Sequence, residues 1–541
     1  MLEIKYIFVV GGVTSSLGKG IISASLGALL KTSGYKVTIQ KLDPYINVDP
    51  GTINPYEHGE CYVTEDGSET DLDLGHYERF LGVHTSKFNN ITTGSIYNAV
   101  IKKERIGDYL GKTVQIIPHI TDEIKNKMFQ LIMRKKYDFV IVEIGGCVGD
   151  IESLPFIESI RQLKWDLGDN NVIVLHLALL PYLKSAKEIK TKPLQNSVKT
   201  LLSVGIQPDI LICRSEKEIP QNIRKKISLF CNVENDSIIQ ALDVNIIYDI
   251  PILMYKEGLS RIVLKKLSFK EKKKPNLLIW KKFLSKLKKS NKQIKIGIIG
   301  KYTELPDSYK SINESLIHAS AKNKCKVKIE LISSKNIFEN TASFFLSHLD
   351  GILVAPGFGI KGINGKISSI KYARKNNIAF FGICLGMQCA IIEFAKNVLN
   401  WNKAASLEYD LNTKFPVIDL MPLQKNIKKI GGTMRLGSFF CKIKKNTNSF
   451  FAYNSEYISE RHRHRYEFNV KYLEYFKKKG MINTGINPQT GLIEIIEFVK
   501  NDWFVGTQFH PELKSTPLSP HPLFTSFIKA SFFCKNKKFN L

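Results

Sequence analysis

The sequence predicts an α/β protein made of two domains, each built on a doubly wound parallel sheet. Short apolar runs without a polar break, such as residues 6–10, 139–142 and 378–381, have the composition of strands buried on both faces. Several of these runs alternate with segments of helical apolar spacing, and this alternation produces parallel sheets. The length of 541 residues also exceeds what one hydrophobic core holds. The chain therefore divides into at least two domains.

The composition excludes several classes of protein. A hydrophobic fraction of 43% with 24% charged residues is typical of a globular protein. No apolar stretch reaches the roughly 20 residues of a membrane span, and the N-terminus runs into a strand pattern rather than a signal peptide. The nine cysteines include no CxxC pair, which fits a reducing compartment better than a disulfide framework. We expect a cytoplasmic protein that binds no membrane.

The net charge of +28 first suggests a nucleic-acid partner. The excess is mostly lysine, however, and it is spread over the whole length beside abundant isoleucine and asparagine. AT-rich codons give this composition without selection for a polyanion. We therefore expect no nucleic-acid partner, and we assign local basic clusters to phosphorylated small molecules.

The first strand, at residues 6–10, leads into a glycine-rich loop that ends in Gly18-Lys19-Gly20. Helical spacing follows at residues 21–31. Strand, glycine-rich loop and helix form the context of a phosphate-binding loop, where backbone amides and a lysine ammonium bind phosphate oxygens. The match is imperfect, because Gly20 stands where Ser or Thr usually supplies a magnesium ligand. Carboxylates elsewhere must then hold the metal.

Carboxylates follow the next strands, at the sheet edge where α/β proteins bind ligands. Residues 43–82 have the composition of a loop dense in Asp and Glu. Such a loop is usually only solvated, but its place after a phosphate loop favours a magnesium role. Glu143 directly follows the strand at residues 138–142 and is a second candidate ligand, with Asp150 and Glu152 close behind.

Two further strands are predicted at residues 172–179 and 209–213. Between them, the segment 188–197 places Lys190 and Lys192 beside a proline that starts a helix. These two lysines are either plain surface charge or the binding group for a second phosphate chain.

A change of composition at Lys270 marks a linker. A short basic helix is predicted at residues 277–289, with an apolar stripe that begins at Trp280 and follows i, i+3, i+4, i+7 spacing. A linker helix docked on a domain is favoured over a membrane-surface helix. A second α/β pattern starts with the strand at residues 294–300.

Cys384 lies where a strand turns sharply into a helix. It follows the apolar run at residues 378–381 and precedes a helix predicted at residues 385–395, with Gly382 and Gly386 leaving room for the turn. This geometry lifts a side chain clear of the sheet and places it at a helix N-terminus, which favours the thiolate. Cys384 is therefore a candidate nucleophile. The alternative is a buried apolar cysteine.

Near the C-terminus, a strand at residues 503–509 delivers His510-Pro511-Glu512. A histidine followed two residues later by a glutamate supplies a base and the group that orients it, as a nucleophile such as Cys384 requires. We expect Pro511 to keep this segment extended.

One basic run in the same domain is ambiguous. Arg461-His462-Arg463-His464-Arg465 either forms a polyanion patch or binds a carboxylate.

These strings resemble two known families. Gly382-Ile383-Cys384-Leu385-Gly386-Met387-Gln388 together with His510-Pro511-Glu512 is similar to the class I, or triad, glutamine amidotransferases. The N-terminal half resembles the amidoligase domain of the CTP synthase family, through residues 11–20, 41–51, 64–80 and 190–193. The likeness covers nearly the whole chain in the right order. It implies a P-loop-like amidoligase domain at residues 1–269, a basic linker helix at 270–293 and a class I glutaminase domain at 294–541.

The resemblance implies ATP-dependent amination of UTP at carbon 4, through a 4-phosphorylated intermediate, with ammonia from glutamine channelled between the domains. It assigns catalysis to Cys384, His510 and Glu512 for ammonia release and to Lys19 and Lys41 for phosphorylation. It assigns Mg²⁺ to Asp73 and Glu143. The residues expected at ATP are Ser15, Ser16, Leu17, Gly18, Lys19, Gly20, Ile21, Asp73 and Val244. Those expected at UTP are Ser15, Asp150, Ile151, Glu152, Lys190, Thr191, Lys192, Pro193, Leu194, Gln195 and Lys226. Those expected at glutamine are Gly357, Leu385, Gly386, Met387, Gln388, Glu408 and Arg465, with the N–H groups of Gly357 and Leu385 as the oxyanion hole.

The resemblance further implies GTP as allosteric activator, CTP as feedback inhibitor and a homotetramer. The sequence departs from the family pattern at several places. Cys61 occupies the apolar gate of the ammonia tunnel, beyond His58, and Leu194 replaces a threonine. Pro356 has no N–H, so the oxyanion hole must rely on Gly357. The segment before Gly431, part of the family's lid, is short, and we hypothesise that GTP activation is weakened.

Two rival functions remain at this stage. Another ATP-dependent amidotransferase, such as a cobyric-acid-type synthase, would share the phosphate loop and the triad but not residues 190–193. A regulatory P-loop or nucleic-acid-binding protein with an inactive glutaminase domain is the non-catalytic alternative.

Overall fold

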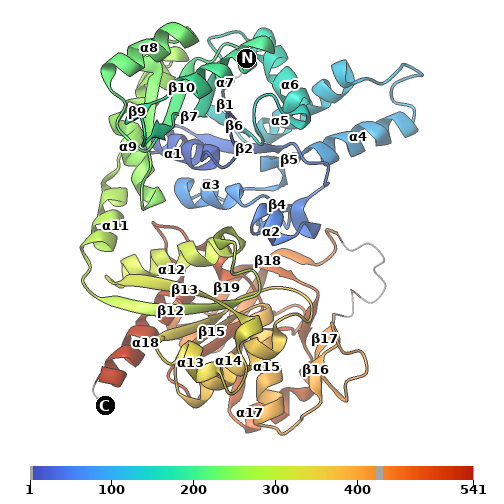
Figure 1. The fold of residues 1–541 in the computed structure, drawn as a ribbon. Coiled ribbons are helices and arrows are strands. Elements are labelled where there is room, and N and C mark those ends of the chain that lie inside the picture. Colours follow the sequence, from blue (N-terminus) through green and yellow to red (C-terminus); the bar gives the residue numbers. More distant parts are fainter. Residues whose placement is uncertain (1–3, 422–423, 425–430, 540–541) are drawn as a thin grey trace. The chain divides into compact units, whose positions relative to one another are not determined.

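The structure is a computed structural model that describes residues 4–421, 424 and 431–539 (Figure 1). The chain forms two compact units. The first contains Met1–Asp49 and Asp73–Lys281, and the second contains Pro50–Leu72 and Lys282–Leu541. This division differs from the sequence-based partition, because Pro50–Leu72 packs within the second unit although the chain on both sides of it belongs to the first.

Within the described residues, the first unit is built on a seven-stranded parallel sheet with the order β11-β10-β7-β1-β6-β2-β5. Its strands are β1 (Lys5–Gly12), β2 (Val37–Asp43), β5 (Asn90–Thr92), β6 (Phe139–Ile144), β7 (Val172–Leu179), β10 (Ile210–Ser215) and β11 (Ile238–Leu242). A short antiparallel pair, β8 (Tyr182–Leu183) and β9 (Glu188–Ile189), precedes the segment predicted to bind UTP. β1 is buried along its whole length, as its uninterrupted apolar run predicts.

Helices cover both faces of this sheet. Tyr6, Phe8 and Val10 of β1 face a core shared with α4, α5 and α6, and Figure 1 shows α1 and α3 on the opposite face. The helices are α1 (Lys19–Thr32), α3 (Asp73–Leu81), α4 (Thr93–Arg105), α5 (Thr121–Arg134), α6 (Leu154–Leu167), α7 (Lys192–Ser203), α8 (Gln221–Cys231), α9 (Ile250–Lys256) and α10 (Leu259–Lys266). The predicted doubly wound sheet is confirmed for this unit.

The second unit, over its described residues, has a nine-stranded sheet with the order β13-β12-β14-β15-β23-β22-β21-β18-β19. The first five of these strands are parallel, and the last four are joined antiparallel. The sheet is therefore mixed rather than purely parallel. Its strands are β12 (Gln293–Gly300), β13 (Lys326–Ser333), β14 (Gly351–Val354), β15 (Ala379–Ile383), β18 (Arg435–Ile443), β19 (Tyr457–His464), β21 (Met481–Ile486), β22 (Ile493–Phe498) and β23 (Phe504–Thr507).

Alternate side chains of β15 divide the core of this unit. Phe380 packs on the side of α14 and α15, whereas Phe381 packs on the side of α12 and α18. The helices are α2 (Pro55–His58), α12 (Lys310–Lys322), α13 (Ala342–Leu346), α14 (Ile363–Lys375), α15 (Leu385–Asn397), α16 (Asn448–Tyr453), α17 (Leu473–Lys478) and α18 (Pro522–Phe539). Small strand groups complete the unit: β3 (Tyr62–Val63) with β4 (Glu69–Thr70), and β16 (Ala404–Ser406) with β17 (Phe415–Leu420) and β20 (Tyr466–Phe468).

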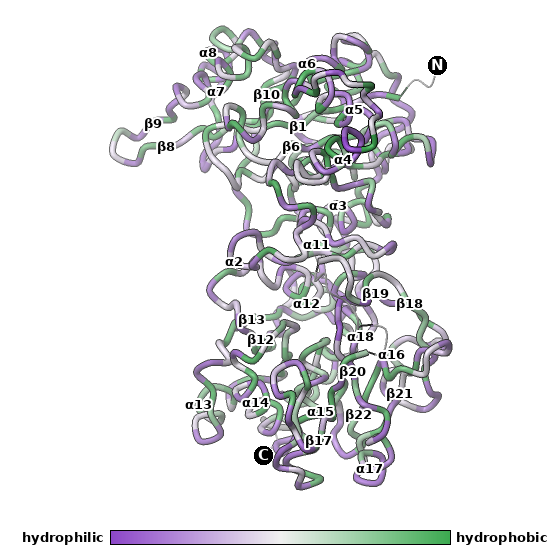
Figure 2. Tube along the Cα trace, turned by 90° about the vertical axis from the view of Figure 1, so that its right-hand side faces the viewer, coloured by the Kyte–Doolittle hydropathy of each residue, from purple (hydrophilic) through white to green (hydrophobic). Residues whose placement is uncertain are grey.

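The linker helix α11 (Leu278–Lys289) alternates between hydrophobic and hydrophilic residues, as Figure 2 shows along its trace. Its apolar stripe is buried: Trp280 contacts Phe80 and Tyr248 in the first unit, and Phe283 contacts His318 in the second. This burial favours the docked linker over the membrane-surface helix. Over the part of the chain that the structure describes, no helix has both the length and the hydropathy of a membrane span.

Two local predictions are wrong. Residues 73–81, expected to be loop, form α3, because Leu74, Tyr77 and Leu81 supply a helical apolar stripe that neighbouring charges hide in the sequence. Pro511 begins a short 3₁₀ turn rather than an extended segment, since its fixed φ also suits the first position of a helical turn.

Candidate active sites

Cys384 lies in the sharp turn from β15 into α15, as predicted. It adopts a left-handed backbone conformation with φ 52°, which is strained for a residue other than glycine. Its N–H donates to the Thr507 carbonyl at 2.7 Å, which fixes the turn to the end of β23. A Cβ on Gly386 would meet the Val354 carbonyl oxygen at 2.2 Å, so only glycine allows the helix to start this close to the sheet.

The parallel pairing of β15 with β23 brings the predicted triad together. Ile383 pairs with Thr507, so the residues that follow each strand emerge side by side. His510 Nδ1 and Glu512 Oε1 are 2.7 Å apart. Burial opposes a charge on His510, but the Glu512 carboxylate and the Cys384 sulfur outweigh it and raise the pKa of His510 to about 10. Cys384, His510 and Glu512 therefore form one electrostatically coupled group.

Several groups surround the Cys384 sulfur. The Gln508 side-chain amide lies 3.6 Å from Sγ, and Sγ lies 3.8 Å from the Arg463 carbonyl oxygen. A Cβ on Gly357 would be 3.6 Å from Leu385 Cδ2, so the two residues predicted to form the oxyanion hole are neighbours. Neither of their N–H groups donates a hydrogen bond within the described residues. They remain available for a ligand.

Among the residues predicted to bind glutamine, Gln388, Glu408 and Arg465 form hydrogen bonds near the site, whereas the Met387 side chain lies in the core. Glu408 accepts from the Gly359 N–H at 2.5 Å, and the Gln388 side chain donates to the Tyr466 carbonyl at 2.9 Å. Arg465 donates to Thr433 Oγ1 at 3.0 Å. Met387, in contrast, is fully buried in the core between α14 and α15 and the sheet, so its side chain is directed away from the site.

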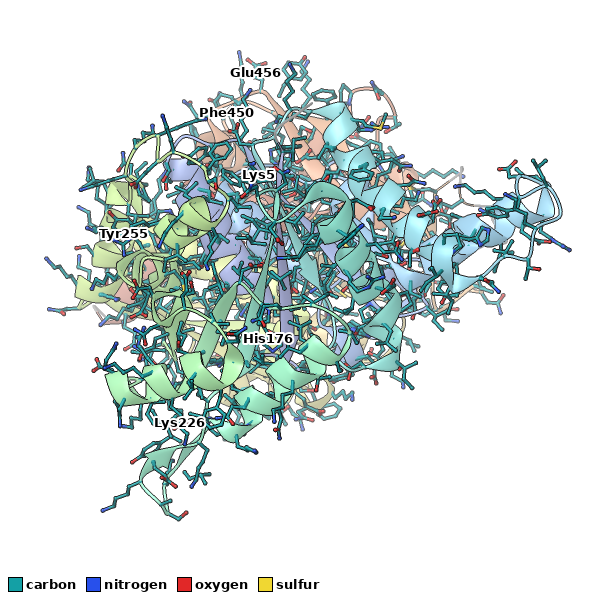
Figure 3. All side chains as sticks on the ribbon, turned by 90° about the horizontal axis from the view of Figure 1, so that it is seen from above. Lys5, His176, Lys226, Tyr255, Phe450 and Glu456 are labelled. Carbon is teal, nitrogen blue, oxygen red and sulfur yellow. The ribbon has the colours of Figure 1, made fainter. Side chains whose placement is uncertain are left out.

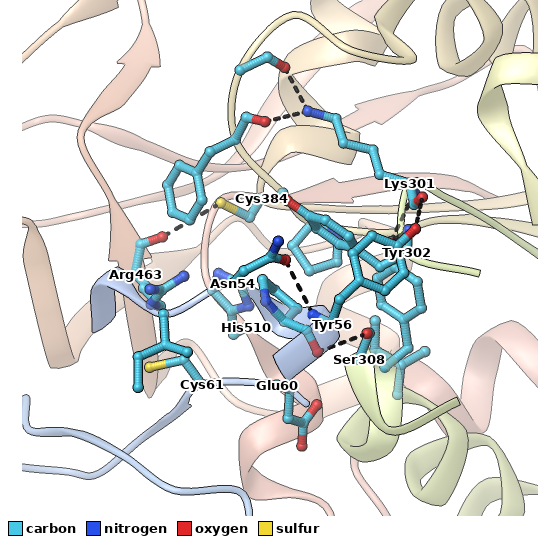
Figure 4. A pocket seen from close by; sticks show the side chains of 18 of the residues that line it. Asn54, Tyr56, Glu60, Cys61, Lys301, Tyr302, Ser308, Cys384, Arg463 and His510 are labelled. Atoms are coloured by element: carbon cyan, nitrogen blue, oxygen red, sulfur yellow. Dashed lines mark hydrogen bonds between the residues drawn. The ribbon is translucent and has the colours of Figure 1, made fainter. Parts of the chain in front are cut away.

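A pocket of about 710 Å³ opens at Cys384 and His510 (Figure 4). One wall comes from Gly51, Thr52, Ile53, Asn54, Pro55, Tyr56, Glu60 and Cys61, all in the segment Pro50–Leu72. The rest of the lining includes Lys301, Tyr302 and Phe358. Cys61, expected at the ammonia gate, thus lines the same pocket as the nucleophile. Sequence reasoning did not find Lys301 or Tyr56, and no local motif marks them.

Three carboxylates hold this segment in the second unit. Glu60 accepts from the Ser311 N–H at 2.9 Å, Glu65 pairs with Arg461 at 3.0 Å, and Glu69 pairs with Arg463 at 2.8 Å. Arg461 is fully buried, and its guanidinium also donates to Tyr62 Oη and the Val63 carbonyl. The basic run at residues 461–465 therefore binds carboxylates of this chain rather than forming an exposed polyanion patch.

In the first unit, Lys41 lies between two candidate metal ligands. The pairing of β2 with β6 sets Lys41 opposite Glu143, with Nζ 3.0 Å from Oε1, and Lys41 also pairs with Asp73. Burial raises the pKa of Glu143 to about 7, although the Lys41 ammonium opposes this shift. Tyr77 Oη donates to the second oxygen of Glu143. The cluster is buried and dense in charge.

The predicted phosphate loop adjoins this cluster. Helix α1 begins at Lys19 after Gly18, whose φ is 93°. Lys19 Nζ donates to the Gly146 carbonyl at 2.7 Å, and burial lowers its pKa. A Cβ on Gly20 would lie 2.1 Å from Asp73 Oδ1, so Asp73 lies directly against the loop. This proximity explains why the position cannot carry the usual Ser or Thr.

The remaining residues predicted at ATP lie along the same sheet edge. Ser15 and Ser16 are exposed, and Leu17 is buried, with Ile21 half-buried at the start of α1. Arg214 donates to the Ser16 carbonyl at 3.0 Å and to Asp243 at 2.9 Å. This bridge ties the loop to the chain around Val244, just after β11.

Apart from Ser15, the residues predicted to bind UTP lie in three separate segments of the first unit. Asp150 accepts from the Cys147 N–H at 2.7 Å, with Ile151 and Glu152 exposed beside it. Lys190 pairs with Glu188, and α7 begins at Lys192. Lys226 is exposed on α8 and is labelled farther toward the edge of the molecule than the buried sheet residue His176 in the view of Figure 3. Leu194 is fully buried in the core between α7 and α8, so its side chain does not reach a ligand.

A magnesium site at Asp73 and Glu143 fits the donor chemistry. Mg²⁺ binds in proteins through one or two carboxylates together with phosphate oxygens and water. Two carboxylates beside a phosphate loop meet this requirement. Over the described ranges, no group of three or more His, Cys, Asp or Glu side chains gathers to hold a metal, so the pair would depend on oxygens from the bound nucleotide.

Two family models match the chain. Residues 5–269 match the family model of the CTP synthase N-terminus, and residues 304–530 match that of the class-I glutamine amidotransferases. The chain thus combines a synthetase domain with a glutamine amidotransferase domain.

Full-length relatives identify the family. The chain is 60% identical to the CTP synthase of Christiangramia forsetii, over 98% of this chain and 97% of the relative. It is 59% identical to the CTP synthase of Cytophaga hutchinsonii, over 99% of this chain and 100% of the relative. A solved structure of the Trypanosoma brucei CTPS glutaminase domain with bound acivicin is 34% identical, covers 44% of this chain and 93% of its own, and has a TM-score of 0.42. The chain belongs to the CTP synthase family.

Proposed function

We propose that this chain makes CTP by amination of UTP, with ATP as phosphoryl donor and glutamine as nitrogen donor. The observation that carries the proposal is the coupled group of Cys384, His510 and Glu512. It occurs in one chain with a phosphate loop and the Lys41, Asp73 and Glu143 cluster, as a glutamine-dependent ligase requires.

At the glutaminase site, the Cys384 thiolate attacks the amide carbon of glutamine, and a C–S bond forms while the carbonyl electrons move onto oxygen. The N–H groups of Gly357 and Leu385 stabilise this oxyanion. His510 protonates the amide nitrogen, the C–N bond breaks, and ammonia leaves behind a thioester. Water, deprotonated by His510, then releases glutamate and restores the thiol. Glu512 keeps the imidazole oriented.

The substrate glutamine is recognised at both ends. Arg465 presents its guanidinium to the α-carboxylate, and Glu408 and Gln388 bind the α-amino group and the amide end. The backbone around Gly386 and Met387 contributes through main-chain atoms, since the Met387 side chain is in the core.

At the ligase site, the loop of residues 15–21 and the Lys19 ammonium bind the phosphates of ATP. The uracil oxygen attacks the γ-phosphorus and ADP leaves. Ammonia then adds to carbon 4 and phosphate leaves. Lys41 stabilises the charge that develops on the transferring group. Asp73 and Glu143 would hold Mg²⁺, which neutralises phosphate charge when bound.

UTP binding is assigned to residues 150–152, to residues 190–195 at the start of α7, and to Lys226. Leu194 contributes through its backbone, and the exposed carboxylates and lysines of these segments supply the polar contacts. Ammonia released at Cys384 passes Cys61 on its way to the first unit. Residues 1–269 carry the synthetase chemistry and residues 294–541 the glutaminase chemistry, except that Pro50–Leu72 completes the glutaminase pocket.

Regulation and assembly follow the family. We propose GTP as activator, CTP as feedback inhibitor, a homotetramer and a cytoplasmic location, the last supported by nine cysteines without a CxxC pair. The short segment before Gly431, on which weakened GTP activation rests, lies largely outside the described residues. Equal enhancement of glutamine hydrolysis by GTP in this protein and in a relative with a longer lid would overturn that hypothesis.

The decisive experiment measures CTP formation from UTP, ATP and glutamine, with and without GTP. A UTP titration that monitors phosphate release separates this function from that of a cobyric-acid-type synthase. Absence of UTP-dependent phosphate release would end the proposal.

A further inference from the structure

The turn that carries Gly357 has a buried lysine behind it. Lys366 lies on α14 and is 0% exposed. Its ammonium donates to the carbonyl of Ala355, the residue two positions before Gly357. The Ala355 N–H is bonded to the Ile299 carbonyl at 3.0 Å, so the peptide groups on both sides of Ala355 are held by hydrogen bonds.

A second lysine holds the far end of the same turn. Lys301, on the loop after β12, donates to the carbonyls of Phe358 and Gly359, the latter at 2.6 Å. The Gly359 N–H donates to Glu408, as described above. The chain from Ala355 to Gly359 is thus bonded at both ends, whereas the N–H groups of Gly357 and Phe358 between them donate no hydrogen bond to the described residues.

This arrangement matters because Pro356 cannot donate. In a turn with two N–H groups, a small rotation of one peptide leaves the other donor in place. Here residue 356 offers no donor, and the oxyanion relies on the Gly357 N–H, so the direction of that N–H depends on the carbonyls that fix the turn. A buried ammonium costs desolvation, and burial lowers the pKa of Lys366 to about 8. An apolar side chain would fill this place without that cost.

We propose that Lys366 is a positioning residue of the glutaminase site, which orients the Gly357 N–H toward the developing oxyanion by holding the Ala355 carbonyl. Lys366 does not touch substrate and acts only through the turn. This inference rests on the proposed function, because it assumes that Cys384 cleaves a carboxamide.

The test compares Lys366→Met with Lys371→Met. Methionine keeps the length and apolar stem of lysine but has no donor, and Lys371 lies on the same helix, where it pairs with Glu339 away from the turn. We expect Lys366→Met to lower the kcat of glutamine hydrolysis by about 10- to 100-fold, less than the 10²- to 10³-fold typical for loss of an oxyanion donor itself. KM for glutamine should change by less than about threefold.

Two further readouts separate positioning from a merely structural role. Alkylation of Cys384 by iodoacetamide requires no oxyanion hole, and CTP formation from ammonium chloride requires no glutaminase. Both rates should match those of Lys371→Met. The proposal is overturned if kcat for glutamine stays within threefold of the control, or if alkylation falls in parallel with hydrolysis.

Lys366→Gln provides a second variant, since glutamine retains an N–H donor on a shorter side chain. We expect its kcat to lie between those of the wild type and Lys366→Met, and a kcat equal to that of Lys366→Met with alkylation also lost would count against the proposal. If Lys366→Met does not fold, as judged by thermal unfolding, the Gln variant decides by the same kcat and alkylation criteria. Failure of the wild type and of Lys371→Met to hydrolyse glutamine would instead refute the proposed function.

Discussion

The two sites place their charges in opposite ways. In the first unit, the Lys41 ammonium lies in direct contact with the carboxylates of Asp73 and Glu143. In the second unit, one strained cysteine is coupled to one histidine and one glutamate. In the function proposed above, the first site binds highly charged nucleotides, whereas the second forms its reactive charge on sulfur. Substitutions should therefore affect the two sites through different steps.

The largest effect should come from removing the nucleophile or the phosphate-loop lysine. Cys384→Ala should lower glutamine-dependent CTP formation by at least about 10³-fold, because no other group forms the thioester, while ammonium-dependent synthesis continues. Lys19→Ala should abolish synthesis with both nitrogen donors. Parallel assays with glutamine and with ammonium chloride measure the difference.

Retention of glutamine-dependent synthesis by Cys384→Ala would revive the idea of an inactive glutaminase domain. If Lys19→Ala lost CTP synthesis with only one of the two nitrogen donors, the assignment of Lys19 to ATP binding would be wrong.

A smaller effect is expected from Glu512→Gln. Loss of the carboxylate removes the interaction that raises the pKa of His510 to about 10, so the pKa should fall. The His510 imidazolium would then lose its proton at a lower pH than in the wild type. We expect glutamine hydrolysis to fall by about 10²- to 10⁴-fold. The pH dependence of Cys384 alkylation checks the direction.

An alkylation profile that is unchanged by Glu512→Gln would show that the carboxylate only orients the ring. Ammonium-dependent synthesis serves as the internal control, because the ligase site is untouched.

A change in stability, rather than in chemistry, is expected from Glu65→Gln. Glu65 pairs with Arg461, which is fully buried and keeps its bonds to Tyr62 and Val63. Removal of the carboxylate charge leaves the buried positive charge of Arg461 less well neutralised. The free energy of unfolding should fall by about 1–3 kcal/mol. Thermal unfolding measures the loss, and Glu104→Gln, at an exposed ion pair, is the matched control with little expected change.

The smallest effect is expected from Met387→Leu. Met387 packs in the core, and a swap of similar volume costs less than about 1.5 kcal/mol. KM for glutamine should remain within twofold of the wild-type value in steady-state assays. A large rise in KM would mean that this side chain, and not only its backbone, contacts the substrate.

The sequence was sufficient to predict a site where one local pattern determines both the structure and the chemistry of that site. Cys384 and His510 each follow an apolar strand, and the parallel order of those strands brings them together. The sequence did not predict which distant residues pack together. The partners Glu65 and Arg461 lie almost 400 positions apart, and either could equally have faced solvent. Lys366 has the sequence context of an ordinary helix-surface lysine, and only the tertiary structure places it behind the Ala355 turn.

The packing of Pro50–Leu72 has a consequence for how the protein can be dissected. The polypeptide passes between the units three times, at residues 49/50, 72/73 and 281/282, rather than once through a single linker. A protease that cuts the lysine-rich stretch around residues 270–274 would leave the N-terminal fragment still inserted in the glutaminase unit through Pro50–Leu72. A recombinant fragment of residues 282–541 would carry the triad but lack the Gly51–Cys61 wall of its pocket. Shuffling of the two enzymatic halves between homologues must therefore exchange this insert together with the glutaminase half.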